Sequence, residues 1–504
     1  MVIIMKQQVF NPFLPIDTYI PDGEPHVFGD RVYLFGSHDK EGGEMYCMLD
    51  YEFWSAPVND LSDWSSKGVN YSSSQDPLSK KSNRRYMYAP DCVRGNDGKY
   101  YLYYCLSGDN GVGCYYGPIS VAVCDTPDGK YQFYGYVKFP DGTLCKKYVP
   151  FDPAVINDNG TIRLYYGTCY PFDDLPKISQ PIMHKMQSKM FDKTVKEIKA
   201  EKGGVMGAIA CELEDDMLTI KTIPKRILPT KTKGTPFESR ANIFKKDGHG
   251  LSGHGFYEGS SIRKINNKYY FIYSSVNNHE LCYATSDFPD KNFEYGGVIV
   301  SNGDVGYNNR KEKDRLNHTG TTHGSIEKIN GAWYVFYHRQ THGTDYSRQA
   351  CAEKIDILPD GTILQTEITS CGLNDGDLLG KGEYPAVICC NLTNGRMPHG
   401  GNKSFKNLPK ITSGNGERYL TNLKANTIVT YKYFDLPETK SISIKARGNG
   451  VITVLAKDKQ YGDLSVNSEY WNDFSGCLTG VKHSDLTFKI KSGNLEILSF
   501  ELLN

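Results

Sequence analysis

The chain has 504 residues, too many for one ordinary hydrophobic core, so its length predicts two domains, one of them large. Its 58 Lys and Arg balance 58 Asp and Glu without a basic run or basic helical face, so neither nucleic acid nor an anionic membrane is expected as a partner. The 36 tyrosines favour β-sheet and surfaces that stack against flat, hydroxyl-rich ligands.

The N-terminal stretch MVIIMKQQVF has an apolar run too short for the hydrophobic region of a signal peptide, and no later stretch has membrane-spanning length. We therefore expect a soluble, cytoplasmic protein. The 14 cysteines are scattered singly through strand-like segments without a CxxC pair, which favours reduced, packed thiols over disulfides or a metal cluster.

Five segments repeat one design along the first part of the chain: a polar residue, a short strand, a Gly/Asn/Asp turn and an aromatic-rich strand. Turns of this composition tolerate positive φ, so each segment predicts a β-hairpin. The opening polar residues lie about 10 to 12 positions before the middle of the second strand, and we expect them to be structurally equivalent. The segments are 21–37, 89–105, 151–168, 257–275 and 322–339, opened by Asp22, Asp91, Asp152, Glu258 and His323 respectively.

Helical patterns are sparse, and the main candidate, 183–200, is lysine-rich and is expected in or beside an insertion. The fold class is therefore predicted to be all-β. Five hairpin units with irregular insertions are best built as a five-bladed β-propeller, in which radial repetition leaves only short protected edges. Equivalent inner positions then converge on the axis, so Asp22, Asp152 and Glu258 are predicted to face one central cavity.

The pattern changes near the end of the repeats, where alternating strands such as TIVTYKYFDL, SISIKARG and GVITVLAK predict a C-terminal β-sandwich. We expect a propeller domain over residues 1–370 and a sandwich over residues 371–504.

Four motifs carry a family resemblance: YAPD at 88–91, DPAV around Asp152, EGSS at 258–261 and HGS at 323–325. Together they resemble glycoside hydrolase family 43, the five-bladed inverting arabinofuranosidases, xylosidases and arabinanases, over roughly residues 10–355. The resemblance implies that Asp22 is the general base, Glu258 the general acid, and Asp152 the aspartate that raises the pKa of the acid and orients the sugar.

The resemblance also implies substrate contacts and a metal position. It places Arg348, Asp91 and Tyr88 at the sugar, and His323 beneath the cavity, where many members hold calcium through water. We expect no required cofactor, and calcium near His323 is the one candidate metal. The family usually has Pro after the base and Trp in the second motif, whereas this chain has Gly23 and Tyr88, so the sugar contacts differ from the usual pattern.

The base has a competing candidate, because GEPHV makes Glu24 look like the counterpart of Asp152 in DPAV. The repeat spacing favours Asp22 instead. Asp22 precedes Tyr33 by 11 positions, as Asp152 precedes Arg163, whereas Glu24 is two positions short.

The three acids suit inverting hydrolysis, which needs a protonated carboxyl beside the leaving oxygen and a carboxylate on the opposite face of the sugar to activate water. Apolar walls and a neighbouring anion can raise the pKa of a Glu enough for the first role. Asp22 would stay ionised and act as the base.

The sandwich resembles family 6 carbohydrate-binding modules in YKYFDL, KARGNG and LEILSFELL. Trp471 and Tyr470 are candidates for stacking on a sugar, but a packed structural domain is the alternative, and the sequence leaves both open.

Three functions are compatible with the sequence: an exo-acting α-L-arabinofuranosidase, a β-xylosidase, and a non-catalytic sugar-binding propeller. The complete set of three acids argues against the last, since a lectin has no need of an acid, a base and a modulator. The expected partners are short arabinose- or xylose-containing oligosaccharides, and homo-oligomer formation stays open.

Overall fold

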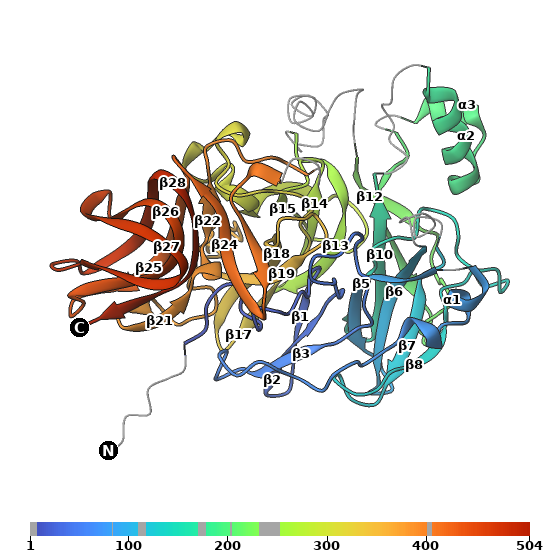
Figure 1. Cartoon of the computed structure of the whole chain (residues 1–504). Coiled ribbons are helices and arrows are strands. Elements are labelled where there is room, and N and C mark those ends of the chain that lie inside the picture. Colours follow the sequence, from blue (N-terminus) through green and yellow to red (C-terminus); the bar gives the residue numbers. More distant parts are fainter. Residues whose placement is uncertain are drawn as a thin grey trace.

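The computed structural model describes residues 8–82, 84–108, 117–169, 178–201, 204–230, 253–400 and 406–504. Two all-β units lie side by side in Figure 1, a propeller drawn in blue to yellow and a sandwich drawn in orange to red. The predicted fold class, a five-bladed propeller followed by a β-sandwich, is confirmed.

Five antiparallel sheets of consecutive strands form the blades. In every blade the first two strands are one of the predicted hairpins, so the repeat is confirmed. The strands are β1 (Glu24–Phe28), β2 (Arg31–Phe35), β3 (Trp54–Pro57) and β4 (Ser65–Ser66); β5 (Arg84–Arg94), β6 (Tyr100–Gly108), β7 (Ser120–Cys124) and β8 (Gln132–Tyr136); β9 (Ala154–Asp158), β10 (Thr161–Thr168), β11 (Gly207–Leu213) and β12 (Lys225–Pro229); β13 (Phe256–Ile265), β14 (Lys268–Ser275), β15 (Glu280–Ser286) and β16 (Glu294–Ser301); and β17 (Ser325–Ile329), β18 (Ala332–Gln340) and β19 (Arg348–Ile355).

The first strands of the blades line the axis. Contacts run from β1 to β5, β5 to β9, β9 to β13, β13 to β17 and back from β17 to β1. A parallel bridge between Gly23 and Gly324 joins the first blade to the last. This closed ring brings the starts of all five inner strands to one place.

Among the described residues, helices lie in short connections and in one insertion. The predicted helix at 183–200 is confirmed as a pair, α2 (Gln180–Phe191) and α3 (Val195–Ala200), inserted between β10 and β11. A left-handed Asp192 ends α2, and Thr194 caps α3 by accepting a hydrogen bond from the backbone of Glu197. The other α-helix, α1 (Pro77–Ser82), precedes β5.

The C-terminal unit packs its strands around an aromatic core that includes Tyr384, Tyr431, Phe434, Phe488 and Phe500. The last propeller strand ends at residue 355 and the first sandwich strand begins at 378, so the predicted boundary at 370/371 lies in the connecting segment. The strands are β20 (Leu378–Leu379), β21 (Gly382–Pro385), β22 (Asn391–Thr393), β23 (Lys410–Gly414), β24 (Glu417–Lys424), β25 (Ile428–Asp435), β26 (Ser441–Ala456), β27 (Lys459–Cys477) and β28 (His483–Leu503).

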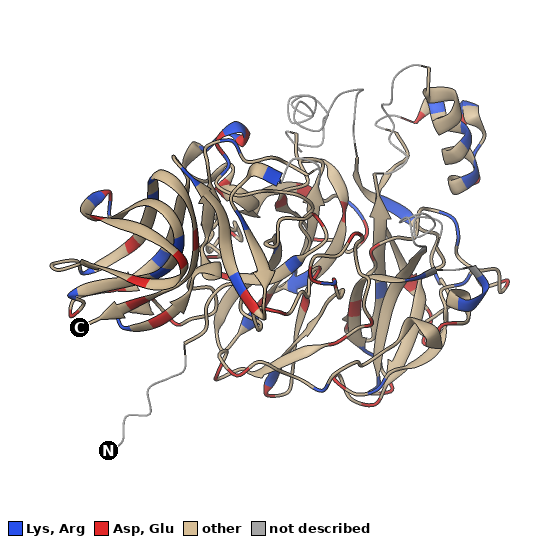
Figure 2. Cartoon of the chain, in the orientation of Figure 1, with Lys and Arg blue, Asp and Glu red and all other residues tan. Residues whose placement is uncertain are grey.

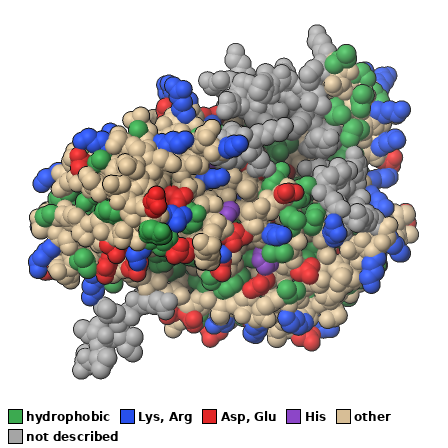
Figure 3. Space-filling model, in the orientation of Figure 1, with side chains coloured by type: hydrophobic (Ala, Val, Ile, Leu, Met, Phe, Trp, Pro, Cys, Tyr) green, Lys and Arg blue, Asp and Glu red, His purple; other side chains and the backbone are tan. Residues whose placement is uncertain are grey.

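The surface carries both signs of charge. Lys and Arg are interspersed with Asp and Glu over both domains in Figure 2, in keeping with the balanced composition. On the face drawn in Figure 3, hydrophobic side chains of the described surface lie in small groups between charged ones. Within the described ranges every cysteine is free, and no helix is long and apolar enough to cross a membrane.

Candidate active site

The inner strands approach the axis through a strained backbone. Each of the first four blades has a residue with positive φ two positions before a paired residue of its inner strand. These paired residues are Glu24, Asp91, Ala154 and Ser261. His323 holds the corresponding place in the fifth blade, two residues before Ser325. The positive-φ residues are Asp22 (57°), Ala89 (31°), Asp152 (46°) and Gly259 (72°).

This register confirms that Asp22, Asp152 and His323 are equivalent, and it corrects the two other predicted equivalences. Asp91 lies two residues beyond the position equivalent to Asp22, and it matches Glu24 in the first blade. Glu258 lies one residue before the position equivalent to Asp22. The reason is local irregularity: the pairing shifts between Tyr88 and Asp91 and again around Glu258. Such bulges add residues to one strand, so counting along the sequence misses them.

Asp22 is buried and held from several sides. Its Oδ1 accepts a hydrogen bond of 2.8 Å from Nη1 of Arg348, and its backbone N–H donates to Nδ1 of His338 at 3.1 Å. Nε2 of His338 lies 2.8 Å from the carbonyl of Thr321, so this histidine is a neutral imidazole with its proton on Nε2. Burial and the Arg348 charge lower the pKa of His338 to about 3, which agrees with the neutral form.

Electrostatics keep Asp22 ionised. Burial by itself would raise its pKa, but the guanidinium of Arg348, with His338, His323 and a hydrogen bond from Ser37, lowers the pKa to about 2. A buried carboxylate of this kind is a hydrogen-bond acceptor at any working pH. It can therefore take a proton from water.

Glu258 lies in a bulge of β13, near enough to Asp22 for the two charges to interact. Gly259 permits the bulge, since its φ is 72° and a Cβ there would lie 3.0 Å from the ring of His323. Glu258 is half-buried. Burial and the charge of Asp22 raise its pKa to about 8, against an opposing contribution from Arg348. At neutral pH this carboxyl is protonated and can donate a proton.

Asp152 lies against Glu258. Its Oδ2 accepts a 3.1 Å hydrogen bond from the backbone N–H of Gly259, the residue after Glu258. Burial raises the pKa of Asp152 well above its usual range, and the charges of Glu258 and Asp22 raise it further. Asp152 and Glu258 thus form a buried pair in which ionisation of one opposes ionisation of the other.

Arg348 begins β19 and is buried. Its Nε and Nη2 donate to the two carboxylate oxygens of Asp39 at 2.8 and 3.0 Å, while Nη1 donates to Asp22. The ring of Tyr46 lies 4.7 Å from the guanidinium. The arginine is therefore fixed by Asp39, and it orients Asp22 from within the predicted site.

Three of these residues were not predicted from the sequence: Asp39, Tyr46 and His338. Asp39 and Tyr46 lie in the connection between β2 and β3, outside the repeat. His338 belongs to a repeat segment, but only the direction of its ring toward Asp22 shows its importance. No sequence motif marks any of them.

The predicted substrate residues Asp91 and Tyr88 occupy different surroundings. Asp91 is fully buried, with Oδ1 2.7 Å from Nε2 of His26 and Oδ2 accepting from the backbone of Val155. Asp91 has no exposed surface for a sugar and holds neighbouring blades together, contrary to the prediction. Tyr88 is half-buried beside Phe151, with ring centroids 6.2 Å apart.

Glu24 lies one layer below Asp22. Its Oε2 accepts from Nη2 of Arg263 at 3.1 Å and from Ser261, also at 3.1 Å. Burial and the charge of Asp91 raise the pKa of Glu24 to about 8. Glu24 therefore belongs to a buried network with Arg263 and Ser261, whereas the charge of Asp22 acts on Glu258.

Two buried polar atoms lie close together on Glu24 and His323. Oε1 of Glu24 and Nε2 of His323 are buried, have no hydrogen-bond partner among the described residues, and lie 3.9 Å apart. Glu24 also groups with His26 and Asp91 closely enough for their ligand atoms to share an ion. Carboxylate oxygens suit a hard cation such as Ca²⁺, so these residues fit the group that the resemblance implies.

The predicted sugar-stacking residues of the sandwich differ in exposure. Tyr470 is 78% exposed. Trp471 is half-buried: its Nε1 donates to Glu417 and its ring lies 4.2 Å from the guanidinium of Arg447. Arg447 thus covers one face of the indole, and sugar binding at this cluster stays a prediction.

The comparisons with known proteins agree with this site. The sequence model of Glycosyl hydrolases family 43 matches residues 11–212. A "Xylosidase/arabinosidase" from Thermoclostridium stercorarium is 43% identical over 520 residues, covering 99% of this chain and 99% of that protein. The propeller and its buried acids, with these matches, define the chain as a glycoside hydrolase and exclude a non-catalytic sugar-binding propeller.

The chain belongs to glycoside hydrolase family 43. Solved structures show the same fold. A family 43 arabinoxylan arabinofuranohydrolase from Bacillus subtilis has a TM-score of 0.50 at 18% identity, covering 98% of both chains. A GH43_1 enzyme from Xanthomonas citri, complexed with xylose, has a TM-score of 0.51 at 23% identity, covering 71% of this chain and 93% of that one.

Proposed function

We propose that the protein is an inverting, exo-acting glycoside hydrolase that releases α-L-arabinofuranose from arabinose-containing oligosaccharides. Asp22 is the general base, Glu258 the general acid and Asp152 the residue that modulates the acid. The observation that supports this proposal is that two neighbouring carboxyls have opposite pKa shifts: Arg348 lowers the pKa of Asp22 to about 2, and burial with the charge of Asp22 raises the pKa of Glu258 to about 8. Two carboxyls whose pKa values are pushed apart are suited to opposite proton-transfer roles.

The reaction follows from these protonation states. Glu258 gives its proton to the glycosidic oxygen as the bond to the anomeric carbon breaks, and Asp22 takes a proton from the water that attacks the opposite face. The attacking oxygen becomes the new anomeric hydroxyl with inverted configuration. At the end of the reaction Glu258 is ionised and Asp22 is protonated. Proton exchange with solvent returns both carboxyls to their starting states.

Asp152 supports the acid through charge. Its carboxyl shares the buried site with Glu258, and its link to the backbone of Gly259 fixes it beside the bulge that carries the acid. A negative charge at Asp152 disfavours ionisation of Glu258 and so keeps the proton available.

Arg348 and Tyr88 are proposed to contact the sugar. The Arg348 guanidinium lies in the same cluster as the acids, and Tyr88 is half-buried close to Ala89, the positive-φ residue of the second blade. Ala89 itself is anchored, because its N–H donates to Ser37 at 2.8 Å.

A second candidate function is β-xylosidase activity on xylo-oligosaccharides. The observation that favours it is the relative from Thermoclostridium stercorarium, whose name includes both activities and which matches the full length of this chain. Arabinofuranose and xylopyranose present similar hydroxyl patterns, so one pocket can admit both.

The test is the hydrolysis of p-nitrophenyl α-L-arabinofuranoside and β-D-xylopyranoside side by side, followed by product analysis on arabino- and xylo-oligosaccharides. A higher kcat/KM on the arabinofuranoside, with only monosaccharide released, supports the first function. Preference for the xyloside replaces it with the second, and release of longer products contradicts exo action. Inactivity on both sets of substrates contradicts both functions.

Calcium at the axis, cytoplasmic location and a sandwich domain over 371–504 are further parts of the proposal. If the ion binds, Glu24 and His323 would hold it, and its positive charge would stabilise the carboxylates under the cavity. The oligosaccharide substrates are short, which agrees with an intracellular enzyme.

A further inference from the structure

Two loops of the propeller lie beside Arg348 and also contact the sandwich. We call them the rim loops: residues 36–53 between β2 and β3, and residues 341–347 between β18 and β19. The hairpin β23–β24 of the sandwich reaches both. In Figure 1, β24 lies between the rest of the sandwich and the strands β18 and β19.

The central contact is an ion pair between Arg418 of β24 and Glu41 of the first rim loop. Nε and Nη2 of Arg418 donate to the two carboxylate oxygens of Glu41 at 3.0 and 2.8 Å. The side chains are only 17% and 26% exposed, so solvent screens the pair less than a surface ion pair. Tyr19 adds a hydrogen bond of 3.3 Å to Glu41.

The second rim loop joins the same cluster. His342 lies 3.6 Å from the carboxylate of Glu41 through Nδ1 and 3.4 Å from Oγ of Ser413 in β23 through Nε2. A Cβ at Gly343 would lie 2.7 Å from the side chain of Lys410, so the backbone there approaches the sandwich closely. Both rim loops are thus held against one hairpin.

A short path connects Glu41 to the active site. The N–H of Gly42 donates to Oγ of Ser347, which directly precedes Arg348. Five residues after Glu41, the ring of Tyr46 lies over the Arg348 guanidinium. The position of Glu41 therefore constrains the side chain that covers the arginine of the sugar pocket.

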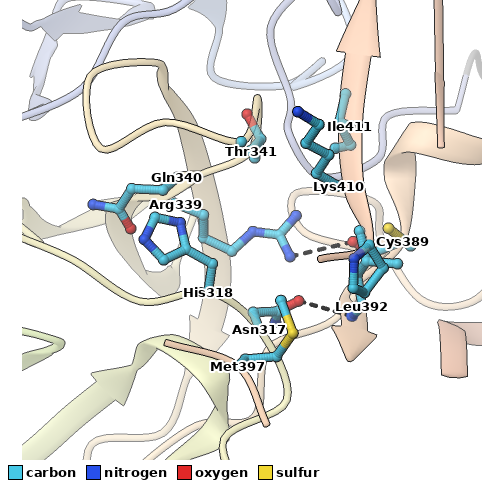
Figure 4. A pocket seen from close by; sticks show the side chains of 12 residues that line it. Asn317, His318, Arg339, Gln340, Thr341, Cys389, Leu392, Met397, Lys410 and Ile411 are labelled. Carbon is cyan, nitrogen blue, oxygen red and sulfur yellow. Dashed lines mark hydrogen bonds between the residues drawn. The ribbon is translucent and has the colours of Figure 1, made fainter. Parts of the chain in front are cut away.

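The sandwich has other attachments to the propeller, so loss of this ion pair would not release it. Arg339 of β18 donates to the carbonyls of Cys389 and Cys390, and Asn317 accepts from the N–H of Leu392. Figure 4 shows the contacts of Arg339 with Cys389 and of Asn317 with Leu392 beside a cavity of about 40 Å³ between the two domains.

We propose that Arg418 is a positioning residue for the sugar-binding site. Through the Arg418–Glu41 ion pair, the sandwich domain holds the rim loops in place. This inference rests on the proposed function, because the proposed function places the sugar beside Arg348, whose guanidinium Tyr46 covers. It gives the C-terminal domain a part in substrate binding that requires no sugar site of its own.

The test compares Arg418→Ala, Glu41→Ala, the double variant and the exchanged pair Arg418→Glu/Glu41→Arg on the better of the two p-nitrophenyl glycosides. Lys491→Ala is the control, because Lys491 is also an ion-paired cation of the sandwich, and its partner is Asp463 of β27 and not a rim loop. Melting temperatures are measured for all variants, and hydrogen exchange is measured over residues 40–47.

We expect Arg418→Ala to raise KM about five-fold, the factor that corresponds to roughly 1 kcal/mol, with a smaller change in kcat and faster exchange over residues 40–47. The double variant should be no worse than either single variant, the exchanged pair should recover part of the loss, and Lys491→Ala should behave as the wild type. An unchanged KM and unchanged exchange in Arg418→Ala would overturn the proposal. So would additive losses in the double variant. An inactive wild type would instead refute the proposed function. The hydrogen-exchange data would still show whether the Arg418–Glu41 ion pair holds residues 40–47 in place.

Discussion

The protonated state of Glu258 should cost the protein stability, and the substitution Glu258→Gln should recover it. The pKa of this carboxyl is raised from 4.5 to about 8 in the folded protein, first by burial and then by the charge of Asp22. In the unfolded chain the carboxyl ionises near pH 4.5, so between pH 4.5 and 8 the unfolded state gains about 1.4 kcal/mol per pH unit relative to the folded state. Gln has nearly the same shape and cannot ionise.

The magnitude follows from the shift. At pH 7 the difference between pH and the unfolded pKa is about 2.5 units, which corresponds to about 3 kcal/mol as an upper bound. Glu258 is half-buried, so solvent screening reduces the expected gain of the variant to between about 1 and 3 kcal/mol. For a domain of this size that is a rise in Tm of about 2–4 °C.

The assay is a set of thermal or urea unfolding curves for wild type and Glu258→Gln at pH values from 4.5 to 8. The two proteins should be nearly equal at pH 4.5, and the variant should gain steadily as the pH rises. Glu438→Gln is the control, because Glu438 is exposed on the sandwich and its substitution should change little at any pH. A stability difference that stays constant across this range would refute the protonated state of Glu258.

Two further predictions concern residues in the surroundings of Glu258. Asp152→Asn should move the alkaline limb of kcat/KM, expected near pH 8 from Glu258, to lower pH, because ionisation of Asp152 can then no longer oppose ionisation of the acid; an unchanged limb would leave Asp152 with only an orienting role. Calcium chloride should raise Tm relative to magnesium chloride at equal ionic strength, and Glu24→Gln should reduce that rise, because Glu24 and His323 offer the free ligand atoms. An equal rise in both proteins would place the ion elsewhere.

The sequence predicts the fold well because the propeller is a repeat of local hairpins. Turn residues and alternating aromatics specify each hairpin within about 17 residues, and equivalent hairpins can be compared with one another. The same comparison places Asp22 and Asp152 in equivalent positions, which the positive φ at both residues confirms.

The prediction fails where strands are irregular. Asp91 looked equivalent to Asp22 by counting, but an irregular pairing beside Tyr88 places it one layer deeper, in contact with His26. Glu258 is shifted by one residue from the equivalent position because of a bulge at Gly259. Bulges depend on how two strands pair, and one strand's sequence does not specify them.

Contacts between segments that are far apart in the sequence could not be predicted from the sequence either. Asp39 fixes Arg348 across 309 positions, and Arg418 reaches Glu41 across 377 positions. Neither pair has a motif, because an ion pair needs only two opposite charges that the fold brings together. Such residues become visible only when the closed ring and the docked sandwich are known.

The most direct test of the account is the dependence of Glu258→Gln on the leaving group. We predict that kcat/KM for an arabino-oligosaccharide falls by a factor on the order of 10³ or more, because the leaving oxygen needs a proton, while kcat/KM for the activated 2,4-dinitrophenyl α-L-arabinofuranoside falls by about ten-fold or less. Asp22→Asn should impair both substrates alike, because both need the activated water. Equal losses of Glu258→Gln on the two substrates would contradict the assignment of Glu258 as the general acid.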